Sequence, residues 1–351
     1  MTKKEKINSF DPNSVGNLNN NIFGLPFTTE ESEVVLIPVP WEVTVSYGSG
    51  TANGPKAIFE ASFQVDLYDA NIKDAWKMGI AMDKIPANIK TQSNRLRKKT
   101  EAYISLLEQG KNPESNKKMK AIVAEVDKAA RELNAHVKKT TSNFLSKNKT
   151  VGLVGGDHST PLGFMQALSE QHSSFGILQI DAHADLRKAY EGFEFSHASI
   201  MYNALKINAV SKLVQVGIRD YCEEEVDVIK NNPARITTYF DRDIKRRMFE
   251  GETWKKICDE IINLLPDNVY LSFDIDGLDP KLCPNTGTPV AGGFEMEQAL
   301  YLIERVVKSG KTIIGFDLNE VSPGKDEWDA NVGARLLYRM ALLVARSQKK
   351  I

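Results

Sequence analysis

The segment FGILQIDAHAD, residues 175–185, joins a largely apolar run to three polar side chains of metal-ligand type. The run Phe175–Ile180 has the composition of a strand buried on both faces, which is typical of a parallel sheet covered by helices. Asp181, His183 and Asp185 follow at two-residue spacing. Because side chains two apart on extended chain point the same way, this short segment can supply three ligands to one point.

Three other apolar runs lead into polar groups of the same kind. They are Val151–Val154 before GGDHS (155–159), Val269–Phe273 before DIDGLDP (274–280), and Thr312–Phe316 before DLNE (317–320). The carboxyl ends of parallel strands share one edge of a sheet, and ligands bind in the crevice outside that edge. The sequence therefore predicts that carboxylates and imidazoles from four strands meet at one rim.

Runs of strand character alternate with helical patterns along the chain. Besides these four, strands are predicted at Val34–Ile37, Leu213–Ile218 and Arg235–Tyr239. The sequence has no linker-like break and no internal repeat, which favours a single three-layer α/β domain whose mostly parallel sheet is flanked by helices. We assign this domain to residues 33–351. Residues 1–32 are polar and rich in Asn, and they predict a loosely tied N-terminal arm.

Residues 96–146 carry the strongest helical pattern in the chain. From Ser115, the predicted N-cap, apolar residues follow at helical spacing with Lys and Glu between them: Met119, Ile122, Val126, Ala129, Leu133, Val137 and Phe144. Such a stripe is typical of a helix that covers one face of a sheet, and the alternative is a partner-binding helix. His136 lies in this stretch without other chemically active residues and is interpreted as structural.

A glycine-rich stretch, YGSGTANGP (47–55), follows the first predicted strand. Pro55 marks a helix start. The spacing G-x-G-x-x-x-G differs from the dinucleotide-binding G-x-G-x-x-G, and no second strand with an acidic end follows about 20 residues later. We therefore expect this loop to line a site of another kind.

Composition excludes several classes of function. The chain has 45 Lys+Arg and 46 Asp+Glu, a formal charge of −1, which disfavours a generally basic nucleic-acid-binding protein. Its three cysteines form no C-x-x-C pair, which excludes a disulfide scaffold and fits a reducing cytosol. The first residues lack the apolar core of a secretory signal, and no apolar run reaches the roughly 20 residues of a membrane span. We expect a cytoplasmic protein with neither a nucleic-acid nor a membrane partner.

Six side chains at the predicted rim are of metal-ligand type: His158, Asp181, His183, Asp185, Asp274 and Asp276. So many carboxylates in one crevice repel one another unless cations neutralise them. Six protein ligands exceed what one catalytic metal takes while keeping an open position, so the count favours two ions per chain. Imidazoles and carboxylates without thiolates favour a hard ion such as Mn²⁺, with other divalent metals left open. A paired site generates hydroxide at neutral pH, so the pattern predicts hydrolysis.

Hydrolysis also needs a group that delivers a proton to the leaving group. His197 lies twelve residues past Asp185 on the loop that leaves the predicted rim. Because imidazole titrates near neutral pH, we interpret His197 as a general acid or proton shuttle. The alternative is a capping or core histidine. His172 lies in the polar run EQHSS and is interpreted as a surface residue.

Taken together, GGDHS, DAHAD, SFDIDGLDP and NEVSP resemble the ureohydrolase superfamily, the arginase and agmatinase group, over roughly residues 33–345. The resemblance implies an arginase-like fold, two Mn²⁺ ions on the six ligands with Asp181 and Asp274 bridging, and a homotrimer or homohexamer. It also implies that Glu320 binds the substrate guanidinium, that Asp185 stabilises the tetrahedral intermediate and that His197 delivers the proton. The segments Gly287–Pro289 and Gly292–Gly293 match the family loop at the metal rim.

The segment DLRKAYEGFEFSHAS, residues 185–199, resembles the corresponding loop of bacterial and archaeal agmatinases. Arg187 stands where arginases carry the Asn that reads the amino-acid head of arginine. We therefore expect hydrolysis of agmatine to putrescine and urea, with Arg187, His197 and Glu320 contacting the substrate. Lys188 replaces an acid of those agmatinases, and together with Arg187 it favours a carboxylate tail. Arginine, guanidinobutyrate, guanidine and formiminoglutamate therefore stay open as substrates.

Two other classes of protein share the predicted layout. A metal-dependent amine deacetylase resembles it but works with one metal ion and fewer ligands. A non-catalytic scaffold that kept the fold would have lost a ligand, whereas all six ligand positions are filled here. The full ligand set together with Glu320 favours the hydrolysis of a small guanidino substrate.

Overall fold

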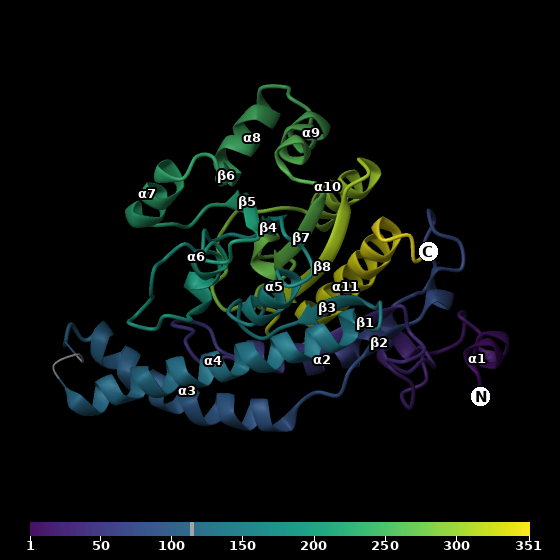
Figure 1. The fold of residues 1–351 in the computed structure, drawn as a ribbon, viewed down its shortest axis with the longest axis horizontal. Helices are drawn as coiled ribbons and strands as arrows, with labels where there is room; N and C mark the ends of the chain where they lie inside the picture. Colours follow the sequence, from purple (N-terminus) through teal and green to yellow (C-terminus); the bar gives the residue numbers. More distant parts are fainter. Residues whose placement is uncertain (113–115) are drawn as a thin grey trace.

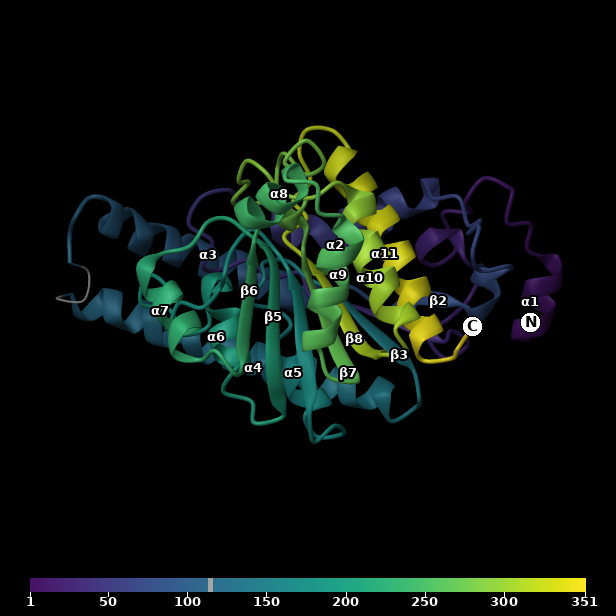
Figure 2. The same cartoon turned by 90° about the horizontal axis from the view of Figure 1, so that it is seen from above.

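The computed structural model describes residues 1–112 and 116–351. Within them, one sheet of eight parallel strands has helices on both faces (Figures 1 and 2). The strand order is β2-β1-β3-β8-β7-β4-β5-β6. The strands are β1 (Val34–Pro38), β2 (Ile80–Met82), β3 (Thr150–Val154), β4 (Phe175–Ile180), β5 (Val210–Ile218), β6 (Ile236–Phe240), β7 (Asn268–Asp274) and β8 (Thr312–Asn319). The predicted α/β class with a parallel sheet is confirmed.

The helices are α1 (Lys3–Ser9), α2 (Gly54–Ala61), α3 (Ala87–Glu108), α4 (Lys117–Leu145), α5 (Leu162–Leu168), α6 (Ile200–Ala204), α7 (Glu223–Asn231), α8 (Asp241–Phe249), α9 (Trp254–Leu264), α10 (Met296–Lys308) and α11 (Trp328–Ser347). Except for the short α1, which has no buried residue and lies beyond the end of the sheet, they cover its two faces (Figures 1 and 2). None of the helices in the described part of the chain combines the length and the apolarity that a membrane crossing requires.

Alternate residues of the strands build two separate cores. On β1, Val34 and Leu36 belong to the core that includes residues of α2, α9, α10 and α11, whereas Val35 and Ile37 belong to the core that includes residues of α3, α4, α5 and α6. Successive side chains of a strand point to opposite faces, so a strand that is apolar at every position is buried on both. Truncating a buried Leu of this kind to Ala costs about 2–5 kcal/mol of the free energy of unfolding. Two such cores hold the sheet edge, and the loops on it, in place.

The seven predicted strands are all present, and the short strand β2 was missed. β2 contains only three residues, so its apolar run is too brief to be recognised from the sequence. It pairs with β1 at the edge of the sheet.

The long amphipathic helix is α4, and its apolar stripe faces the sheet as predicted. Ile122, Val126 and Leu133 are buried in the core on that side. The predicted N-cap, Ser115, lies outside the described residues. The helix is capped by Asn116, whose side chain accepts a hydrogen bond from the Lys118 N–H at 2.9 Å. His136 is exposed on the outer face.

The prediction of a loosely tied arm is wrong for residues 22–27. Ile22, Phe23, Leu25 and Phe27 are at most 3% exposed and belong to one of the two cores. The Phe23 N–H donates to a buried hydroxyl, Ser62 Oγ, at 2.8 Å. The Asn-rich surroundings hide this short apolar group in the sequence, although its burial fixes the segment to the domain.

Candidate metal centre and active site

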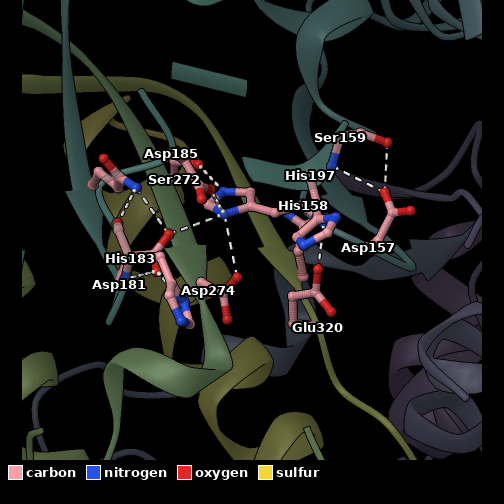
Figure 3. Close-up of polar contacts among 12 residues, drawn as sticks. Asp157, His158, Ser159, Asp181, His183, Asp185, His197, Ser272, Asp274 and Glu320 are labelled. Atoms are coloured by element: carbon pink, nitrogen blue, oxygen red, sulfur yellow. Dashed lines mark hydrogen bonds and ion pairs between the residues drawn. The ribbon is translucent and has the colours of Figure 1, made fainter. Parts of the chain in front are cut away.

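Loops at the carboxyl ends of four central strands meet at one point of the sheet edge (Figure 3). The loop after β3 carries His158, and β4 continues into Asp181. β7 ends at Asp274, and β8 leads into Glu320. These four strands are neighbours in the order β3-β8-β7-β4, so their ends bring residues about 160 positions apart within contact distance.

The first group of side chains surrounds the Nδ1 atom of His158. This atom lies 3.0 Å from Asp181 Oδ2, 3.1 Å from Asp185 Oδ2 and 3.2 Å from Asp274 Oδ2. All four side chains are buried. One nitrogen and three carboxylate oxygens thus converge on a space shielded from water.

The second group surrounds the Nδ1 atom of His183. This atom lies 2.9 Å from Asp276 Oδ2 and 3.7 Å from Asp181 Oδ1. Asp181 therefore contributes one carboxylate oxygen to each group. The ligand atoms of His158, Asp181 and Asp185 are close enough together to bind one ion. The same holds for the ligand atoms of Asp181, His183 and Asp276. The six predicted ligands thus lie together as two adjoining donor sets that share Asp181.

Hydrogen bonds behind His158 fix its ring so that Nδ1 faces the carboxylates. The Nε2 atom lies 2.9 Å from Ser272 Oγ, and this hydroxyl donates to Asp317 Oδ1 at 3.1 Å. Because the Ser272 hydroxyl donates to Asp317, it accepts from Nε2, and a metal ion would take the place of the proton at Nδ1. Among the described residues this buried atom makes no well-aligned hydrogen bond, although the three carboxylate oxygens lie 3.0–3.2 Å from it. An unprotonated imidazole nitrogen held in this way fits a metal ion.

The carboxylates are also oriented by donors within the sheet. Gln179 Nε2 donates to Asp181 Oδ2 at 2.8 Å, and the Ala182 N–H donates to Asp276 Oδ1 at 3.0 Å. Sequence reasoning missed Gln179 and Ser272, and it placed Asp317 at the rim without assigning it a role. The signal that could have found the first two is a polar residue inside an otherwise apolar strand, because a buried polar group needs a specific partner.

The electrostatics of the site favour a bound cation. Burial, together with the charge of Asp181, raises the pKa of Asp185 to about 7. Burial and the charges of Asp276 and Asp181 also raise the pKa of Asp274 well above its ordinary value. Burial opposes ionisation of Asp181 too, but the hydrogen bonds and charges of His158 and His183 hold its pKa below the ordinary value. Divalent ions relieve such crowding of acids, so the residues present fit a metal pair.

Glu320 adds a carboxylate that lies beside the donor sets and belongs to neither of them. Its Oε1 accepts the His158 N–H at 2.8 Å, and its backbone has a φ of +62°, which is uncommon outside glycine. Its Oε2 is buried without a partner among the described residues. A Cβ on Gly287 would lie only 3.1 Å from that oxygen. Glycine there leaves space over the free oxygen, and a planar cation could fill it.

Burial, with the charges of Asp274 and Asp157, raises the pKa of Glu320 well above its ordinary value. A bound cation would stabilise the ionised form of this buried acid. A guanidinium suits it, because it presents N–H donors in a fork that matches a carboxylate.

A cavity of about 120 Å³ leads to the donor sets from solvent. Its lining includes His183, Asp185, His197, Arg187, Tyr190, Asp220, Tyr221, Glu225, Ser46 and Thr288. His197 is half-buried, and its ring meets the Tyr190 ring edge-on at 5.9 Å between centroids. Burial, together with the positive neighbours His183, His158 and Arg97, lowers the pKa of His197 to about 3. The imidazole is therefore neutral at neutral pH.

Arg187 also lines the cavity, but its charge is engaged by protein groups. Its Nε lies 3.8 Å from Glu225 Oε2, and its guanidinium lies over the Tyr190 ring at 4.8 Å from the centroid. Lys188 is exposed and does not line the cavity. Asp220 presents a carboxylate whose side chain is 66% exposed, and its Oδ2 lies 3.8 Å from His183 Nε2. The cavity mouth is therefore more acidic than the sequence alone suggested.

Glu191 lies at the turn of the loop that carries Tyr190 and His197. Its φ is +53°, and its Oε2 is buried without a hydrogen-bond partner in the described part of the chain. Burial and the charge of Glu108 raise its pKa to about 7, against opposing effects of Arg97 and Arg187.

We expect Glu191→Gln to raise the thermal midpoint at pH 8. The raised folded-state pKa means that wild-type stability falls as pH rises from about 4.5 through 7, whereas Gln stays neutral. The difference between the two proteins should vanish at pH 4. Melting curves recorded from pH 4 to 8 measure it, and a constant difference across that range would contradict this origin.

Comparison with known proteins is consistent with the fold and the site. A profile of the Arginase family matches residues 32–343. The chain is 31% identical to an N(1)-aminopropylagmatine ureohydrolase of Thermus thermophilus, over 88% of this chain and 89% of that one. It is 27% identical to an agmatinase of Bacillus subtilis, over 89% and 92%.

Solved structures show the same fold. The agmatine ureohydrolase of Thermoplasma volcanium superposes with a TM-score of 0.69 at 22% identity, covering 99% of both chains. Proclavaminate amidino hydrolase of Streptomyces clavuligerus gives a TM-score of 0.69 at 20% identity, over 95% of this chain and 99% of that one. The family that the sequence motifs indicated is thus confirmed: the chain belongs to the arginase family and is a ureohydrolase.

Proposed function

We propose that this ureohydrolase converts agmatine and water to putrescine and urea, with two Mn²⁺ ions per chain as its cofactor. One observation carries the proposal: two nitrogen-and-oxygen donor sets share Asp181 and adjoin Glu320, a buried acid with one free oxygen. Metal ions on the donor sets would activate water, and Glu320 would bind a guanidinium. Together they suit hydrolysis of a C–N bond in a guanidino group.

The ions would be held by the side chains that already converge. His158, Asp181, Asp185 and Asp274 would hold one, and His183 and Asp276 with the other oxygen of Asp181 would hold the second. When bound, such a pair lowers the pKa of water and supplies a nucleophile at neutral pH. Hard donors without thiolate support Mn²⁺ over softer ions.

The side chains of this protein bind and orient the guanidino group. Glu320 Oε2 accepts hydrogen bonds from its N–H groups, while the His158 N–H holds Oε1 and keeps the carboxylate in place. Asp185 lies at the cavity wall and accepts hydrogen bonds from the amino groups of the tetrahedral intermediate. Because these groups are buried, their interactions with a cation are stronger than in water.

His197 handles the proton that the leaving amine requires. From its place in the cavity lining, the imidazole would pass a proton released at the attacking water to the departing nitrogen as the C–N bond breaks. The products are urea and a primary amine. Tyr190 packs against the ring and limits its rotation.

The charge of the cavity mouth supports a cationic tail on the substrate. Arg187 is engaged by Glu225 and Tyr190, which leaves Asp220 as the exposed acid of the cavity lining. The Bacillus subtilis relative is an agmatinase, and the Thermus thermophilus relative is named for a derivative of agmatine, N(1)-aminopropylagmatine. A tail that ends in an ammonium group fits this mouth better than a carboxylate does.

We expect Asp220→Asn to raise the KM for agmatine about three- to fivefold. An exposed ion pair contributes up to about 1 kcal/mol, which corresponds to that factor. The amide keeps an oxygen beside His183 Nε2, so kcat should change little. The KM for uncharged-tail analogues should not change. Steady-state urea assays with agmatine and with an uncharged-tail analogue measure the effect. An equal rise in KM for both compounds would show that Asp220 does not recognise the tail.

The proposal is tested by urea release from Mn²⁺-loaded protein over a panel of compounds. The panel holds agmatine, N(1)-aminopropylagmatine, arginine, guanidinobutyrate and guanidine, with formiminoglutamate scored by formamide release. The highest kcat/KM should belong to agmatine. A higher kcat/KM for another compound would make that compound the substrate in place of agmatine. If no compound released urea or formamide, the proposed function would be overturned. The homotrimer or homohexamer and the cytoplasmic location stay predictions of the sequence.

A further inference from the structure

Two long helices outside the metal centre contact both walls of the substrate cavity. α3 and α4 form a hairpin that runs along one face of the sheet and extends beyond its strands (Figures 1 and 2). One wall is the segment 42–54, the wall loop, which contributes Ser46 to the cavity. The other is the segment 186–199, the catalytic loop, which contributes Arg187, Tyr190 and His197.

α3 holds the wall loop through three polar side chains on one helix face. Their spacing along the helix places them in a row beside the loop. The contacts are Ser93 Oγ accepting the Glu42 N–H at 2.9 Å, Thr100 Oγ1 donating to the Val43 carbonyl at 2.5 Å, and Arg97 Nη1 donating to the Val45 carbonyl. The last contact lies directly before Ser46, the residue of this loop that faces the cavity.

Glu42 extends this anchoring into the glycine-rich turn. Its buried carboxylate accepts the N–H groups of Gly50 at 2.7 Å and Ala52 at 3.0 Å. Beyond it, the Gly48 N–H donates to the Gly287 carbonyl at 2.9 Å, and Gly287 lies over Glu320 Oε2. The wall loop thus connects α3 to the space over the proposed guanidinium site.

Arg97 is the central cation of this arrangement. Its side chain is 14% exposed and lies 3.1 Å from Glu101 Oε1 and 4.0 Å from Glu42 Oε1. A planar guanidinium with several donors can bind a carbonyl and acids at once, which a lysine ammonium does less well. Removing it would free the Val45 carbonyl and leave Glu42 with an unbalanced charge.

The hairpin holds the catalytic loop through contacts just before His197. Asp127 Oδ1 on α4 accepts the Glu194 N–H at 3.1 Å. On α3, the Tyr103 ring packs edge-on against Phe193 at 5.3 Å between centroids. Phe193 and Tyr190 form a tight turn, with the Phe193 N–H donating to the Tyr190 carbonyl at 2.9 Å. The hydrogen bond from Glu194 to Asp127 is three residues from His197.

We propose that Arg97 and Asp127 are positioning residues, through which the α3–α4 hairpin sets the places of the wall loop and of His197 in the cavity. The inference rests on the proposed function, because the cavity is taken to hold a guanidino substrate. Neither residue lines the cavity. Arg97 acts on substrate binding through Ser46, and Asp127 acts on proton delivery through His197.

The first arm of the test uses Asp127 with agmatine as substrate. Asp127→Ala removes the acceptor and should lower kcat about 10- to 100-fold, the usual effect of removing a group that orients an active-site residue. Asp127→Asn keeps an acceptor oxygen and should recover most of the rate. In a His197→Ala background, Asp127→Ala should cause no further loss, because both changes act on the same step.

The second arm uses Arg97. Arg97→Met should raise the KM for agmatine about tenfold with a smaller change in kcat, and Arg97→Lys should recover part of it by keeping one donor for the Val45 carbonyl. Lys98→Met and Lys128→Ala are the controls, since both side chains are exposed neighbours on the same helices. They should match the wild type. Melting curves and metal content identify variants that lose structure.

Three results would overturn the inference. The first is a wild-type kcat in Asp127→Ala. The second is that Asp127→Ala lowers kcat by the same factor in the His197→Ala background as in the wild type. The third is an unchanged KM in Arg97→Met. If the wild type and the lysine controls release no urea from any compound of the panel, the proposed function fails instead. Urea release by the wild type with no response to either arm leaves the function standing and removes the positioning roles.

Discussion

Asp181→Ala is expected to lower urea release by at least about 10³-fold and to reduce the bound metal. Asp181 contributes one oxygen to each donor set, so its loss would affect both proposed ions at once. Metal ions supply several kcal/mol of transition-state stabilisation, and about 4 kcal/mol corresponds to 10³-fold in rate. The variant should still fold, because removing an acid from a crowded group lowers the repulsion in the metal-free protein.

The measurement combines steady-state urea assays with elemental analysis of metal content. Asp279→Asn is the matched control, since Asp279 lies in the same SFDIDGLDP segment but outside both donor sets. It should retain activity and two ions per chain. Wild-type activity in Asp181→Ala would show that the shared carboxylate is not part of the catalytic centre.

Glu320→Gln is expected to lower kcat/KM for agmatine roughly 10²- to 10³-fold, which corresponds to about 3–4 kcal/mol. The amide keeps an oxygen for the His158 N–H but loses the negative charge that a guanidinium pairs with. Metal content should not change, because Glu320 belongs to neither donor set.

The same substitution should leave the thermal midpoint unchanged or raise it at pH 8. Burial raises the pKa of Glu320, so folding becomes less favourable as pH rises above the ordinary carboxyl range, whereas Gln has no charge to bury. Activity lost while stability is kept is the signature of a binding residue. Glu327→Gln, an exposed change at the start of α11, is the control. A lower midpoint together with the lost activity would instead indicate a structural role.

The sheet was predictable because its strands are buried on both faces. Runs such as Val151–Val154 and Val269–Phe273 are apolar at nearly every position, and this pattern is hard to produce in another context. β2 and the buried segment 22–27 were missed for the opposite reason. Each is short, and its burial depends on neighbours distant in sequence, such as β1 and Ser62.

The ligand types and their spacing were also readable from the sequence, because each cluster continues a strand. The hydrogen bonds that orient the ligands were not. Ser272 and Gln179 look like minor interruptions of apolar strands, and only the pairing of β7, β8 and β4 places them behind the site.

The charge at the cavity mouth also required the structure. Arg187 and Lys188 read as a basic pair in the sequence. In the structure Arg187 is bound to Glu225, which lies 38 positions later on α7. A charge counted along the chain therefore says little about the field that a substrate meets.

Anomalous scattering from a crystal equilibrated with Mn²⁺ tests most directly whether two ions occupy the shared-carboxylate centre. The expected result is two peaks per chain, one beside His158 Nδ1 and one beside His183 Nδ1, with Asp181 between them. A single peak, or none at this edge of the sheet, would contradict the paired centre and the hydrolysis that depends on it.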